Sequence, residues 1–68
     1  MKRKYNYLIV SQYTTINNTA VFYEDFVTIN YKLNTIENIN KIREDIRRKH
    51  ELNILVTLNI LNIMRLKK

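Results

Sequence analysis

The stretch RRKH, residues 47–50, is the densest group of side chains in this chain that could do chemistry. Its cations could bind phosphate oxygens, because guanidinium and ammonium groups donate charge-assisted hydrogen bonds to anions. Cations at the C-terminal end of a helix are also favoured by the helix dipole, without any ligand. Acidic neighbours at Glu44, Asp45 and Glu51 neutralise this stretch. We therefore expect the four residues to end a helix.

Catalytic and metal-binding signatures are missing from the sequence. It contains no cysteine, and its one histidine, His50, cannot form an imidazole metal site alone. Glu24 and Asp25 are adjacent, so in an extended strand their carboxylates point to opposite faces. Ser11 has no histidine within reach in the predicted layout. We expect no enzymatic activity, no metal and no cofactor.

The net charge of +6 comes from the two ends of the chain. Residues 24–51 contain as many acidic as basic residues, so their charges cancel. Six cations without an interleaved acid make up the excess: Lys2, Arg3, Lys4, Arg65, Lys67 and Lys68. Such a group could contact nucleic acid or an acidic partner. The alternative is that these residues are solvated ends without a ligand.

The first half of the chain has the composition of two strands, since it is rich in aromatic and β-branched residues. Asn17 and Asn18 interrupt it, which predicts a hairpin between strands at residues 5–16 and 19–31. A two-residue turn would place both asparagines at positive φ. A longer loop over residues 14–19 is the alternative.

The two-residue turn would pair Leu8 with Val27, and this register assigns the faces of the hairpin. One face then carries Leu8, Val10, Val27 and Ile29, and we expect a helix to cover it. The opposite face would be an exposed protein interface formed by Tyr5, Tyr7, Ile9, Tyr13, Phe22 and Phe26.

A helix is predicted over residues 35–50. Asn34 can cap its start, and Glu37 adds a box-like contact three residues on. The apolar residues fall on one stripe, so this helix can cover one surface only. The stripe consists of Ile36, Ile39, Ile42 and Ile46.

A third strand is predicted over residues 53–66. Its even positions are apolar except Asn62, whereas on a helix its polar residues would lie all round the axis. Such a strand is long for a small protein. It therefore bends near Asn62, where the alternation slips, or its end reaches another subunit.

Together these elements predict one domain over residues 1–68, with an α+β fold of order β-β-α-β. One helix packs on one face of a three-stranded, antiparallel-type sheet with strand order 2-1-3. The basic ends of the chain then converge at one pole. A domain this small is poorly stabilised alone, so we expect self-association, with a homodimer as the simplest form.

The exposed aromatic face could stack nucleic-acid bases or bind protein. It carries no lysine or arginine, which favours protein. The alternative function is that of a small basic dimer that binds nucleic acid through the ends of the chain. No segment approaches the roughly 18 uninterrupted apolar residues of a membrane span. We expect a cytoplasmic protein that binds neither membrane nor small molecule.

The segments YNYLIVSQY, FVTIN and NTIENINKIREDI, followed by an apolar strand, resemble small β-β-α-β accessory proteins of phages and other mobile elements. The resemblance implies a non-enzymatic protein that binds and inhibits a host macromolecule in the host cytoplasm. Its partner would be a host protein or ribonucleoprotein, such as a CRISPR complex or another nucleic-acid-handling defence complex. Anti-CRISPR and other anti-defence inhibitors are the best-known role of such proteins.

Overall fold

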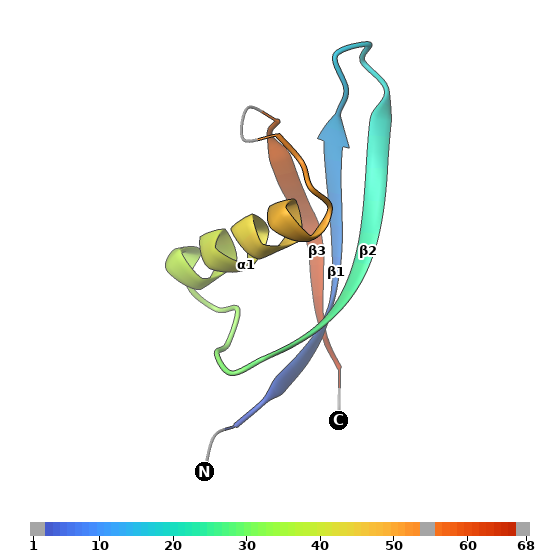
Figure 1. The fold of residues 1–68 in the computed structure, drawn as a ribbon. Coiled ribbons are helices and arrows are strands. Elements are labelled where there is room, and N and C mark those ends of the chain that lie inside the picture. Colours follow the sequence, from blue (N-terminus) through green and yellow to red (C-terminus); the bar gives the residue numbers. More distant parts are fainter. Residues whose placement is uncertain (1–2, 54–55, 67–68) are drawn as a thin grey trace.

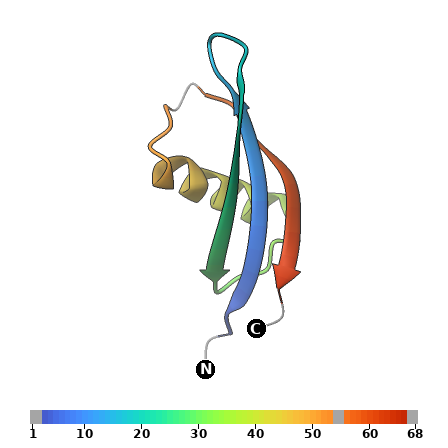
Figure 2. The ribbon, with the colours of Figure 1, turned by 90° about the vertical axis from the view of Figure 1, so that its right-hand side faces the viewer.

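The structure is a computed structural model that describes residues 3–53 and 56–66. The strands form one antiparallel sheet of order β2-β1-β3, and the helix lies on one side of it (Figures 1 and 2). The predicted β-β-α-β fold and its strand order are confirmed. The elements are β1 (Tyr5–Thr14), β2 (Ala20–Ile29), α1 (Ile36–Lys49) and β3 (Leu58–Leu66).

The molecule is elongated, with principal extents of 46 × 19 × 19 Å. Helix α1 crosses the strands, and the β1–β2 hairpin extends beyond it (Figure 1). The start of β1 and the ends of β2 and β3 lie together at the other end of the sheet (Figure 1). None of the helices among the described residues has the length and apolar character needed to cross a membrane.

The hairpin loop comprises residues 15–19, so the longer of the two expected loops is present. Thr15 N–H donates to the Thr19 carbonyl at 2.8 Å, and Asn18 N–H donates to the Thr15 carbonyl at 2.9 Å. Within this loop only Asn18 has positive φ, at 64°. One left-handed residue is easier to supply without glycine than the two that a two-residue turn requires.

The longer loop changes the register by one residue. Leu8 pairs with Phe26, not with Val27, so the predicted pairing is wrong. A shift of one residue turns every side chain of β1 to the opposite face, while β2 keeps its predicted orientation. Helix α1 therefore covers Tyr7 and Ile9 rather than Leu8 and Val10.

The core lies between α1 and this face of the sheet. Its buried apolar side chains are Tyr7, Ile9, Ile42, Ile46 and Leu58. Val27 and Ile29 pack against it, as predicted for β2. The hydroxyl of Tyr7 accepts a hydrogen bond from the Leu33 N–H at 3.1 Å, which satisfies its polar end inside the core.

Helix α1 begins and ends within one residue of the predicted range. Its N-cap is Thr35, not Asn34, because the Thr35 hydroxyl accepts the Asn38 N–H at 3.1 Å. The last turn is basic, as expected. It packs at the middle of β2, where Lys49 pairs with Asp25.

Strand β3 begins at Leu58, later than the predicted residue 53, and residues 54–55 lie outside the described part of the chain. Its pairing with β1 shifts by one residue, since Val10 pairs with Asn62 and Ser11 with Ile60. Leu61 is the extra residue of this bulge. The predicted irregularity near Asn62 is therefore present. Because of the bulge, apolar side chains of β3 face α1 both before and after Leu61.

Candidate interaction surface

The face of the sheet opposite α1 is uncovered, and we call it the open face (Figure 2). Cross-strand pairing builds an apolar row on it, because Leu8 of β1 pairs with Phe26 on one side and with Met64 on the other. Phe22 lies on the same face, four residues from Phe26 along β2. The row runs across all three strands.

The aromatic side chains of the open face are strongly exposed. Phe26 is 71% exposed and Phe22 is 62% exposed, while Met64 at the other edge is 50% exposed. Leu8 and Val10 on the central strand are half-buried. Contiguous exposed apolar side chains of this size are uncommon on isolated proteins and typical of contact surfaces.

Hydrogen-bonded polar pairs border the apolar row along the strands. Thr28 donates through its hydroxyl to Asn6 Oδ1 at 2.7 Å, toward the end of the sheet that holds the chain ends. Toward the hairpin, Asn59 donates to Gln12 Oε1 at 3.3 Å. An apolar centre with a polar rim is the usual composition of a protein interface.

The predicted interface residues divide between the two faces. Phe22 and Phe26 are exposed, as expected. Tyr7 and Ile9 are buried under α1, and Tyr5 and Tyr13 pack partly against the same core. The placement of these four β1 residues on an exposed face is wrong, and the physical reason is the one-residue shift of the hairpin register.

The predicted basic pole gathers Arg3, Lys4 and Arg65, because β1 and β3 are antiparallel. All three are exposed. Arg65 pairs with Tyr7 in the register, directly beside the start of β1. Lys2, Lys67 and Lys68 lie outside the described residues.

The RRKH stretch finds acceptors within the protein. Arg47 donates through Nη1 to the carbonyls of Asn53, at 3.1 Å, and Val56, in the loop after the helix. Arg48 pairs with Asp45 at 2.7 Å, and Lys49 and His50 both reach Asp25. The expectation that these cations end the helix is confirmed, since every one of them has an internal partner.

Asp25 is the centre of a polar cluster that joins β2 to the end of α1. Its side chain is 3% exposed, with Lys49 Nζ at 2.9 Å and His50 Nε2 at 3.0 Å. The His50 ring stacks on Tyr23 at 3.7 Å between centroids, and Tyr23 stacks on Tyr13 at 5.9 Å. The sequence shows these residues only as separate polar positions, because a contact across 25 residues leaves no local pattern.

The chemistry of this cluster is that of a structural ion pair. Burial raises the pKa of Asp25, but the hydrogen bonds and charges of His50 and Lys49 outweigh burial and hold the pKa below its usual value. Burial and the neighbouring Tyr13 raise the pKa of Tyr23. Ser11, the one serine, is fully buried. Among the described residues no three metal-ligating side chains gather.

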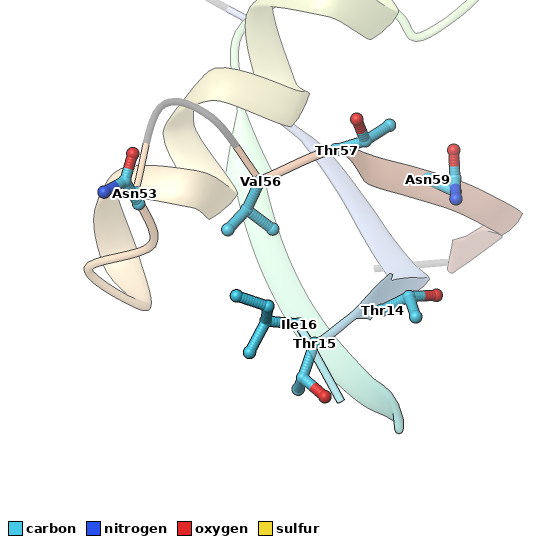
Figure 3. Close-up of a pocket in the computed structure, with 7 residues that line it drawn as sticks. All are labelled: Thr14, Thr15, Ile16, Asn53, Val56, Thr57 and Asn59. Carbon is cyan, nitrogen blue, oxygen red and sulfur yellow. The ribbon is translucent and has the colours of Figure 1, made fainter. Parts of the chain in front are cut away.

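A hollow of about 520 Å³ lies beside the hairpin loop (Figure 3). Hydroxyl, amide and aliphatic groups line it, and none of the described lining side chains is charged. Such a lining can form neutral hydrogen bonds but supplies no acid, base or activated nucleophile. The lining residues are Thr14, Thr15, Ile16, Asn53, Val56, Thr57 and Asn59.

No protein-family model matches the chain, and neither a curated protein nor a solved structure matches it. The geometry of the described residues is therefore what supports a function.

Proposed function

We propose that this chain is a small non-enzymatic protein that binds a host macromolecule through the open face and inhibits it. The exposure of Phe22 and Phe26 on a face that α1 leaves uncovered carries this proposal. Large aromatic side chains contribute more than most residues to the free energy of protein association.

The charge of the open face supports a protein as the partner. The residues of β1 and β2 that point to it include one charged side chain, Glu24, and no lysine or arginine. Nucleic-acid platforms place cations beside their aromatic rings to contact phosphates. A face with an apolar row, polar borders and no cation among the described strand residues that point to it is better matched to a protein surface.

The kind of host partner rests on the sequence resemblance to phage and mobile-element accessory proteins. On that basis the target is a CRISPR complex or another nucleic-acid-handling defence complex in the host cytoplasm. Inhibition would follow from occupying a surface that the complex needs, since no catalytic group is required for that.

A plasmid-interference assay tests this function. Cells with an active CRISPR complex that cleaves a target plasmid would express the chain, and transformation efficiency would be counted. We expect the wild type to restore transformation and the double variant Phe22→Ser/Phe26→Ser to lose that effect. Ile16→Ser is the matched control, because Ile16 is 98% exposed but lies in the hairpin loop, away from the open face.

Equal protection by the wild type and the Phe22→Ser/Phe26→Ser variant would remove the open face from the function. Loss of protection in the Ile16→Ser control would show that removal of any exposed apolar side chain abolishes the effect, so the open face would have no special role. Circular dichroism of each variant would establish that the fold is retained.

A further inference from the structure

The end of the sheet where all three strands meet the chain ends carries a second surface, separate from Phe22 and Phe26. Arg3 and Lys4 precede β1, Lys32 follows β2, and Arg65 lies near the end of β3. All four side chains are exposed. Folding adds Lys32 to the basic residues predicted for this pole. In the sequence Lys32 belongs to residues 24–51, whose charges cancel.

The ring of Tyr5 holds two of these cations. The Arg65 guanidinium carbon lies 5.1 Å from the ring centroid, and the Lys32 ammonium nitrogen lies 5.8 Å from it. Both distances are within the range of a cation–π interaction. An aromatic ring positions cations without neutralising them, so their charges stay available to a ligand.

These cations differ from the cations at the end of α1. Within the described part of the chain, Arg3, Lys4, Lys32 and Arg65 form no ion pair with a carboxylate. Asp45 lines a depression together with Lys4. Asp45 is paired with Arg48 at 2.7 Å, so it cancels little of the field at this pole.

We propose that this pole binds the phosphate backbone of a nucleic acid. Clustered cations that have no carboxylate partner among the described residues concentrate a positive field, and binding them to phosphates releases the counterions of the nucleic acid. Contacts to phosphate carry no information about the bases, so binding is independent of base sequence.

Fluorescence anisotropy with a labelled single-stranded DNA of mixed sequence tests the proposal across a series of salt concentrations. The affinity of the wild type should fall linearly on logarithmic axes as salt rises. The variant Lys32→Gln/Arg65→Gln should reduce that slope by about 1.4, or about 0.7 for each lost contact to a single strand, and weaken binding roughly tenfold for each contact at about 50 mM salt.

Arg43→Gln is the matched control, since it removes the same type of charge from the middle of α1, where Arg43 donates to the neutral side chain of Asn40 and no ion pair among the described residues is broken. It should leave the salt slope unchanged. A loss of slope in Arg43→Gln equal to that of a single pole substitution would show that net charge alone drives binding, and the proposal would fail.

Tyr5→Leu separates the ring from the charges. It keeps every cation but removes their common platform, so binding should weaken by a smaller factor than in the double variant while most of the salt slope remains. Unchanged binding in both Tyr5→Leu and the double variant would overturn the proposal.

Two alternatives to the proposal are that the oligonucleotide binds to the open face and that the natural ligand of the pole is an acidic protein. Phe22→Ser/Phe26→Ser should bind the oligonucleotide as the wild type does, and a loss there would transfer binding to the open face. Polyglutamate should compete poorly at equal charge. If it competes as well as the oligonucleotide, the pole is a site for acidic protein and the proposal is wrong.

Discussion

At the scale of single residues, Asp25 is the most consequential polar group. A carboxylate buried in a small core loses much of its hydration, which costs free energy unless donors replace the water. Lys49 and His50 supply those donors from the last turn of α1 and the residue after it. The contacts of Lys49 and His50 with Asp25 therefore fix where the end of the helix lies on the sheet.

The substitution Asp25→Asn should lower the free energy of unfolding by about 2 kcal/mol, because hydrogen bonds to a charged group are lost inside the core. Urea unfolding followed by circular dichroism would measure it. Asp45→Asn is the control, since Asp45 pairs with Arg48 at an exposed position and its loss should cost less than about 1 kcal/mol. Equal effects of the two substitutions would contradict a special role for Asp25.

The free energy of unfolding should depend on pH through the titration of the Asp25 carboxylate. The pKa of Asp25 is lower in the folded chain than its ordinary value of 3.8, so near that pH the unfolded chain binds more protons. The stabilisation is complete above this ordinary value and is lost as pH falls below it. Unfolding in urea from about pH 6 to about pH 2 should show a smaller acid loss for Asp25→Asn than for the wild type.

At the scale of elements, the end of α1 shows how the chain makes a tight stop without glycine. Glu51 has φ of 55°, and its N–H donates to the Arg48 carbonyl at 3.1 Å. Leu52 N–H donates to the Arg47 carbonyl at 3.0 Å. These two bonds form a Schellman motif, in which the left-handed position is normally glycine.

Glu51→Gly should therefore raise the free energy of unfolding by roughly 0.5–1 kcal/mol, since it relieves the steric cost of a left-handed side chain. Thermal unfolding would show the gain as a higher midpoint. Glu44→Gly, the same substitution inside the helix, should lower stability by about 1 kcal/mol. A loss of stability in Glu51→Gly would mean that the Glu51 side chain contributes more than its backbone strain costs.

At the scale of the whole molecule, one helix covers one face of a three-stranded sheet and leaves the other exposed. The described chain buries a core of few apolar side chains. Association that buries the open face would add to that core and raise stability, since apolar burial is the main favourable term in association.

We expect the purified protein to self-associate as a dimer that is insensitive to salt. Light scattering at tens of micromolar protein, in low and high salt, would give the solution mass. The Phe22→Ser/Phe26→Ser variant should be monomeric, and Ile16→Ser should behave as the wild type. A monomeric wild type in both salts would show that the open face does not mediate self-association.

The amino-acid sequence by itself determined the elements, their order and the placement of the RRKH cations at the end of the helix. Periodicity separates α1 from the strands, and the break in alternation near Asn62 locates the bulge of β3. These features are local, because each depends on residues within a few positions along the chain.

Only the tertiary structure decided which side chains of β1 the open face displays. The choice between a two-residue turn and the loop of residues 15–19 changes the register by one and exchanges Tyr7 and Ile9 for Leu8 and Val10. Both faces of β1 are apolar enough to be buried, so composition could not select between them. The pairing of Asp25 with Lys49 and the meeting of Lys32 with Arg65 around Tyr5 likewise join segments that are distant in sequence.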